Sequence, residues 1–123
     1  MPDPANDASY LYDMLTYAQI VAEMVRGLTR EEYLLDRIRQ LAVERAIEVI
    51  GEAARQVSDA CQQAHPEIPW RPIIAQRHVL AHDYGEVDHE RLWRVAAVHV
   101  PELIDQLRPL IPMLPRQAGE GTD

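Results

Sequence analysis

Apolar side chains recur at intervals of three and four residues along most of this chain, which is the spacing of one face of an α-helix. The first helix is predicted between Asp7 and Arg26. Asn6 or Asp7 can cap its start, and Gly27 can take the left-handed turn at its end. Its apolar face consists of Leu11, Met14, Leu15, Ala18, Val21, Ala22 and Val25.

The longest periodic stretch runs from Asp36 to about Gln63, after a segment in which Thr29 and Glu32 have the spacing of a capping box. Gly51 lies in the middle of this stretch, where a glycine weakens a helix by roughly 1 kcal/mol. The small side chains around it indicate that another helix crosses closely here. We expect the buried face to contain Ile38, Leu41, Ala42, Ala46, Val49, Ile50, Ala53, Val57 and Cys61.

The sequence "HPEIPW" ends this helix, because each proline removes a backbone donor and restricts the residue before it. A shorter helix is predicted to start near Arg71 or Pro72 and to end at Gly85. Asp88 can cap the last long helical segment, in which Pro101 should cause a kink or a restart near Val100.

These segments predict an all-α fold, an antiparallel bundle of four to five helices, with no strand signal. The length of 123 residues suits one domain, which we assign to residues 1–111. The remaining residues, 112–123, combine prolines, glycines and charges without periodicity, and we expect a flexible tail there.

Composition indicates a globular protein of the cytoplasm. Hydrophobic residues make up 47% and charged residues 26% of the chain, and no apolar run is long enough to span a membrane. The single cysteine, Cys61, cannot form an internal disulfide, which suits a reducing compartment. The net charge of -8 argues against coating nucleic acid through a broad basic surface, so any contact with RNA or DNA must be local.

Candidate chemistry is concentrated in the stretch "RHVLAHDY" at residues 77–84. On a helix, His78 and His82 are one turn apart on the same face, and Arg77 lies on its flank. Two histidines at this spacing can bind zinc, but further ligands would have to come from Asp83, Glu90 or His99. In a structural alternative, His82 caps the helix end, Arg77 pairs with a nearby acid and Tyr84 packs.

A metal-independent ribonuclease fits these residue types better than a zinc site does. Cleavage of RNA by its own 2′-hydroxyl needs a group that titrates near neutral pH and a cation that stabilises charge on the phosphorane. His82 can move the protons and Arg77 can hold the phosphate, while Arg71 is a candidate for a further RNA contact. One short helix forms only half of a cleft, so a two-fold dimer would complete it.

The spacing of Arg77, His82 and Tyr84, with the polar residue His78 after the arginine, resembles the signature of the HepT-type HEPN ribonuclease toxins. The likeness extends from about Leu11 to Leu110. It includes "RQLAVERAIEVIGEAARQVS", which resembles the long central helix of that family, and "VDHERLWRVAAVHVPELIDQL", which resembles its closing helices.

The resemblance implies a helical homodimer that cleaves RNA without a metal or other cofactor, at a cleft between two copies of the motif. Arg77, His78 and His82 would be its catalytic residues. The chain would be the toxin of a type VII-like toxin–antitoxin pair, whose MntA-type nucleotidyltransferase antitoxin transfers AMP onto Tyr84. Attached AMP adds bulk and negative charge where an RNA phosphate must bind. The alternative is a non-catalytic helical partner of a nucleotidyltransferase.

Overall fold

The computed structural model of the chain describes residues 4–79 and 87–113, and side chains within 5–76 and 87–111. These residues form helices and contain no strand, in agreement with the predicted all-α class. The predicted tail lies outside them beyond Met113. The elements are η1 (Pro4–Asn6), α1 (Asp7–Val25), α2 (Arg30–Leu34), α3 (Arg37–Gln56), α4 (Asp59–Ala64), α5 (Trp70–Val79), α6 (His89–Arg94), η2 (Val95–His99), α7 (Val100–Leu107) and η3 (Arg108–Met113).

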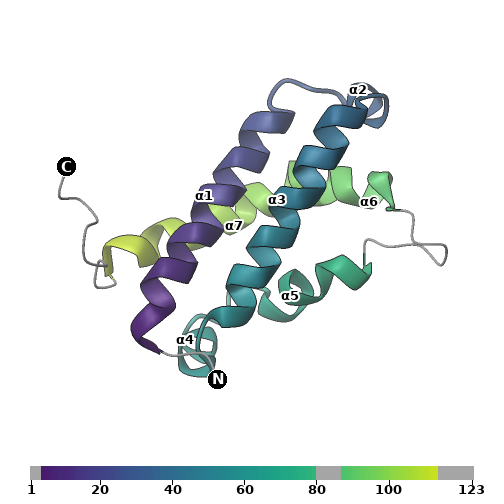
Figure 1. Cartoon of the computed structure of the whole chain (residues 1–123). Coiled ribbons are helices and arrows are strands. Elements are labelled where there is room, and N and C mark those ends of the chain that lie inside the picture. The colour runs from purple at the N-terminus through teal and green to yellow at the C-terminus, as the bar shows by residue number, and fades with distance from the viewer. Residues whose placement is uncertain (1–3, 80–86, 114–123) are drawn as a thin grey trace.

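The two longest helices, α1 and α3, lie side by side and run in opposite directions (Figure 1). α6, η2 and α7 follow one another without a break and cross behind this pair, where α7 contacts α1. α5 packs against α3. The predicted antiparallel packing therefore holds for α1 and α3, whereas the closing helices cross them. Among the described helices, none is long and apolar enough to cross a membrane.

The first helix and the turn after it agree with the prediction. α1 buries Leu11, Met14 and Val21 completely. Gly27 has a φ of 78°, which is the left-handed conformation expected after a helix end. Thr29 and Glu32 form the predicted capping box: the Thr29 hydroxyl accepts from the Glu32 N–H, and the Glu32 carboxylate accepts from the Thr29 N–H.

The prediction of one helix from Asp36 to Gln63 is wrong, because the chain leaves the helical path at Val57 and restarts after Ser58. The Ser58 hydroxyl accepts from the Cys61 N–H and caps α4. Ser58 also donates to the buried Asp7 carboxylate, from its N–H at 2.8 Å and from its hydroxyl at 2.6 Å. Asp7 therefore joins α1 to the break, and neither Asn6 nor Asp7 caps α1 as predicted.

The buried face of α3 also differs from the prediction near its start. Ile38 and Leu41 are 80% and 52% exposed, and Ala42 is exposed too. Gln40 is buried instead, because its side-chain amide donates to the carbonyls of Tyr33 and Leu34, in α2. The pattern of apolar positions predicts that a glutamine lies at the surface, so it cannot reveal a buried glutamine whose amide binds backbone carbonyls. Further along, Val49 and Cys61 are half-buried, while Ala46, Ile50, Ala53 and Val57 are buried as predicted.

The predicted close crossing at Gly51 is present, and its partner is α5. A Cβ atom added to Gly51 would lie 3.0 Å from the backbone carbonyl oxygen of Ile73. Near the C-terminus, the Asp88 side chain caps α6 as predicted by accepting from the Arg91 N–H at 3.1 Å. The helical segment does not stop and restart near Val100, because a π-helical turn, η2, ends at His99 and passes directly into α7 at Val100.

The contact at Gly51 can be tested by substitution to a larger residue. We expect Gly51→Leu to lower the free energy of unfolding by about 1–3 kcal/mol, because the new side chain must push α5 away from α3. Urea denaturation followed by circular dichroism measures the change. Ala42→Leu, at an exposed position of the same helix, should stay within about 0.5 kcal/mol of the natural protein. Equal effects of the two substitutions would contradict a tight crossing.

Candidate active site

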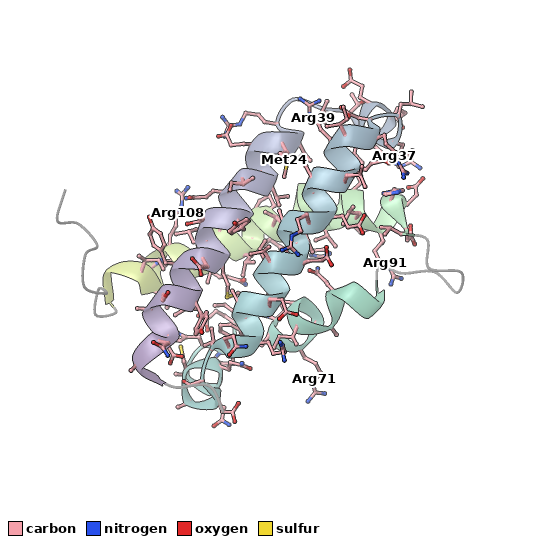
Figure 2. The ribbon with its side chains drawn as sticks, in the orientation of Figure 1. Met24, Arg37, Arg39, Arg71, Arg91 and Arg108 are labelled. Carbon is pink, nitrogen blue, oxygen red and sulfur yellow. The ribbon has the colours of Figure 1, made fainter. Side chains whose placement is uncertain are left out.

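The predicted catalytic residues belong to the end of α5 and to the segment after it. Arg77 and His78 lie in the last turn of α5, and their side chains fall outside the described residues. His82 and Tyr84 also lie outside them. Arg71, the candidate for a further RNA contact, is exposed at the start of α5 and extends away from the helices (Figure 2). It forms no ion pair with another described residue.

The start of α5 is held firmly by buried contacts and backbone hydrogen bonds. Ile68 and Ile73 are 1% and 6% exposed. The Trp70 indole N–H donates to the His65 carbonyl at 3.0 Å, which closes the turn before α5. From α7, the Gln106 side-chain amide donates to the Glu67 carbonyl at 2.8 Å. Together with the crossing at Gly51, these contacts fix the position and direction of the helix that carries Arg77 and His78.

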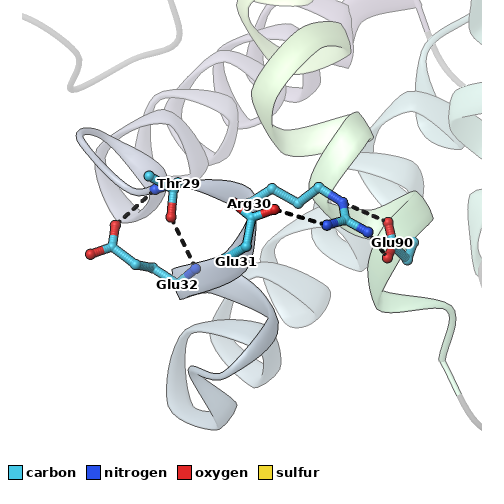
Figure 3. Close-up of polar contacts among 5 residues, drawn as sticks. All are labelled: Thr29, Arg30, Glu31, Glu32 and Glu90. Atoms are coloured by element: carbon cyan, nitrogen blue, oxygen red, sulfur yellow. Dashed lines mark hydrogen bonds and ion pairs between the residues drawn. The ribbon is translucent and has the colours of Figure 1, made fainter.

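The next described helix after the motif in the sequence, α6, is attached to α2 by a bidentate ion pair (Figure 3). The Arg30 guanidinium donates from Nε to Oε2 of Glu90 at 2.9 Å and from Nη2 to Oε1 of Glu90. Arg30 also contacts Glu31 at 3.0 Å. Hydrogen bonds to Glu90 and then to Glu31 raise the pKa of Arg30. The pair is partly exposed and adds little to stability, but its planar geometry fixes the start of α6 against α2.

An aromatic contact beside this ion pair strengthens the junction of α2 with α6. The rings of Tyr33 and Trp93 lie 5.3 Å apart between centroids. The Tyr33 hydroxyl and the His89 Nδ1 are buried and have no hydrogen-bond partner among the described residues. Burial, followed by the negative charges of Glu44 and Asp36, raises the pKa of the Tyr33 phenol. The sequence pattern did not reveal these contacts, because Tyr33 belongs to a helix of only five residues.

The zinc alternative required ligands from outside the motif. Two of its candidates have other partners: Glu90 binds Arg30, and His99 Nδ1 lies 3.4 Å from Glu102 Oε1. Among the described side chains, those of residues 5–76 and 87–111, no group of three or more histidine, cysteine, aspartate or glutamate residues is arranged to hold a metal ion.

The unpartnered Tyr33 hydroxyl leads to a prediction about pH. We expect Tyr33→Phe to leave the free energy of unfolding at pH 7 unchanged or higher, because it removes a buried polar group for which the described residues provide no hydrogen-bond partner. The folded protein retains the Tyr33 proton above the pKa of about 10 that the unfolded chain has. The unfolded state then binds fewer protons, so stability falls as the pH rises.

Urea denaturation at pH 7 and at several pH values above 10 should therefore show a smaller alkaline loss of stability for Tyr33→Phe than for the natural protein. Tyr12→Phe is the control, since Tyr12 is 49% exposed. That variant should lose stability at high pH like the natural protein. An identical alkaline loss in Tyr33→Phe would mean that the Tyr33 phenol does not control it.

Comparison with known proteins identifies a family and several relatives that this chain is similar to. The family described as "Ribonuclease HepT-like" matches residues 14–110. The chain is 37% identical over 94 residues to the probable ribonuclease HepT of Thermococcus cleftensis. The aligned region covers 76% of this chain and 86% of that protein. It is 32% identical over 95 residues to the putative RNase MJ1380 of Methanocaldococcus jannaschii, with 77% and 87% covered. No solved structure matches this chain.

Proposed function

The chain belongs to the HepT-like ribonuclease family, and from that premise we propose that it is a metal-independent endoribonuclease that cleaves cellular RNA. The observation that carries the proposal is the extent of the family match. Residues 14–110 include α5, the whole motif from Arg77 to Tyr84, and the helices that hold α5 in place. The relatives that match along most of their length are named as ribonucleases.

The proposed reaction uses the three catalytic residues without a metal ion. His82 accepts the proton of the RNA 2′-hydroxyl, whose oxygen attacks the adjacent phosphorus. The bond from phosphorus to the 5′-oxygen then breaks, and the leaving oxygen takes up a proton, which a histidine of the motif can supply. Arg77 binds the phosphate oxygens as their charge increases, and His78 adds a polar contact on the same helix. The products are a 2′,3′-cyclic phosphate and a 5′-hydroxyl.

A homodimer would complete the site. Arg77 and His78 lie at the end of one helix, α5, which would supply one wall of a cleft, and a two-fold axis would place a second copy opposite it. The net charge of -8 means that RNA must be held by local cations. Arg71 and Arg77 lie on the same helix, α5, and supply two of them.

Regulation is proposed to act through Tyr84. In this proposal the chain is the toxin of a type VII-like pair in the cytoplasm, and an MntA-type nucleotidyltransferase antitoxin transfers AMP from ATP to the Tyr84 hydroxyl, with release of pyrophosphate. The modified residue lies two positions after His82. Its negative charge and bulk would keep an RNA phosphate away from the site.

Cleavage of total cellular RNA in the presence of EDTA tests the proposed activity. We expect the natural protein, prepared without any nucleotidyltransferase, to cleave RNA, and His82→Ala to lose at least about 100-fold of the rate, as removal of a general acid–base does. His65→Ala is a matched control, since His65 pairs with Glu67 at 3.6 Å and lies outside the motif. The control should cleave normally.

Intact mass is measured first for each protein, because attached AMP would mask activity. Cleavage that persists in His82→Ala would contradict the catalytic assignment. A folded, unmodified natural protein that does not cleave RNA would instead favour the non-catalytic alternative, a helical partner of a nucleotidyltransferase. The acidic net charge is the observation that keeps this alternative in view.

Tyr84→Phe tests the proposed regulation. After incubation with an MntA-type nucleotidyltransferase and ATP, we expect the natural protein to gain the mass of AMP and to lose cleavage activity. Tyr84→Phe should gain no mass and should continue to cleave RNA. Tyr12→Phe, which removes an exposed phenol elsewhere, should be modified like the natural protein. Transfer of AMP to Tyr84→Phe would place the modification on another residue.

A further inference from the structure

A pocket of about 310 Å³ opens beside α5, where this helix meets α3, η2 and α7. The volume is near the lower limit of the roughly 300–1,000 Å³ that small-molecule sites have, so it suits one compact group rather than a helix of a partner. Gln76, which directly precedes Arg77, lines the pocket. The pocket is therefore next to the last turn of α5, which contains Arg77 and His78.

The floor of the pocket is apolar. It is formed by Ile47 and Ile50 of α3, Ile73 of α5, Val95 of η2 and Leu103 of α7. Each of these side chains is buried in the core and presents only a small part of its surface to the pocket. Such a floor favours the flat face of an aromatic ring and excludes a phosphate group, which would lose its hydration there.

The rim of the pocket is polar and rich in hydrogen-bond acceptors. Glu102 and His99 are 66% and 57% exposed and lie beside one another, so their polar atoms can reach a ligand. Glu67 contributes a second carboxylate, and Gln76 and Gln106 contribute amides. No arginine is among the residues that line the pocket in the described structure. The charge of the rim repels phosphate and attracts a group with N–H donors.

The helix that forms one side of the pocket has an unusual backbone. Residues Val95–His99 form a π-helical turn, and Pro101 is the second residue of α7, which follows it. π-helical turns are rare and occur often at functional sites. This turn supplies Val95 to the floor and His99 to the rim, so the departure from α-helical geometry shapes the pocket itself.

We propose that this pocket binds a guanine base of the RNA substrate. The Watson–Crick edge of guanine carries an N1–H and a 2-amino group side by side, and one carboxylate can accept both as charge-assisted hydrogen bonds. Glu102 is the residue assigned to this contact. The ring packs on the apolar floor, and the adjoining phosphate extends toward Arg77. This proposal rests on the proposed ribonuclease function for its substrate.

Binding of free nucleosides tests the proposal without any cleavage step. Guanosine and inosine differ only in the 2-amino group, so we compare their dissociation constants by titration, following backbone amide signals of Ile50 and Leu103 by NMR. We expect guanosine to bind about tenfold more tightly than inosine, because one charge-assisted hydrogen bond is lost in inosine. Glu102→Gln should remove most of this tenfold preference.

Glu23→Gln is the matched control. Glu23 is exposed and pairs with Arg26 three residues away, as Glu102 pairs with His99, but it lies on α1 and does not line the pocket. The control should keep the preference for guanosine. Equal binding of guanosine and inosine, a preference that survives in Glu102→Gln, or nucleoside binding that leaves Ile50 and Leu103 unchanged would overturn the proposal.

The two proposals can fail separately. RNA cleavage without guanosine binding would remove the guanine site and leave the ribonuclease function in place. Guanosine binding at the pocket without RNA cleavage would support the guanine site and contradict the proposed catalytic activity. When both hold, mapping of cleavage positions should show enrichment of guanine beside the cut, and Glu102→Gln should reduce that enrichment.

Discussion

The close packing of α5 against α3 is the constraint on which the rest of the structure depends. Gly51 permits this packing, since a Cβ atom at that position would lie only 3.0 Å from the Ile73 carbonyl oxygen. Because the two backbones are close together, Ile73 and Trp70 are buried in the core, and these contacts fix the direction of α5. Arg77 and His78 occupy the last turn of the same helix. These two residues are thus carried by a helix whose position depends on a backbone contact more than 20 residues away in sequence.

A second constraint acts on the other side of the motif. Arg30 and Glu90 join α2 to α6, and the rings of Tyr33 and Trp93 pack beside them. α2 is itself oriented by its capping box and by Gln40, whose amide donates to two carbonyls of α2. Helices on both sides of the motif are therefore anchored to the core. In the proposed ribonuclease, this arrangement would hold the catalytic groups in place while RNA, an external and flexible ligand, adapts to them.

Charge distribution reconciles an acidic protein with an RNA substrate in this proposal. A protein of net charge -8 gains no general attraction to RNA, so recognition has to be divided between small regions. Arginines on α5 would bind phosphate, whereas the pocket with Glu67 and Glu102 on its rim would accept a base. Because the phosphate and base contacts are separate, the carboxylates can contribute to specificity without opposing phosphate binding. This requires that the RNA base, and not the RNA sugar–phosphate backbone, enters the pocket.

The amino-acid pattern was sufficient to predict the all-α class, the first helix, the caps at Thr29 and Asp88, the close crossing at Gly51 and the motif, because each depends on the spacing of neighbouring residues. The resemblance carried by the motif also indicated the family that the comparison then matched.

Four features became visible only in the folded molecule: the break at Ser58, the burial of Gln40, the contact of Arg30 with Glu90 and the pocket beside α5. The hydrogen bond from Ser58 to Asp7 joins residues 51 positions apart, and no local pattern encodes such a distance. These features arise when distant polar groups find partners as the helices pack, so they belong to the assembled fold and not to any one segment.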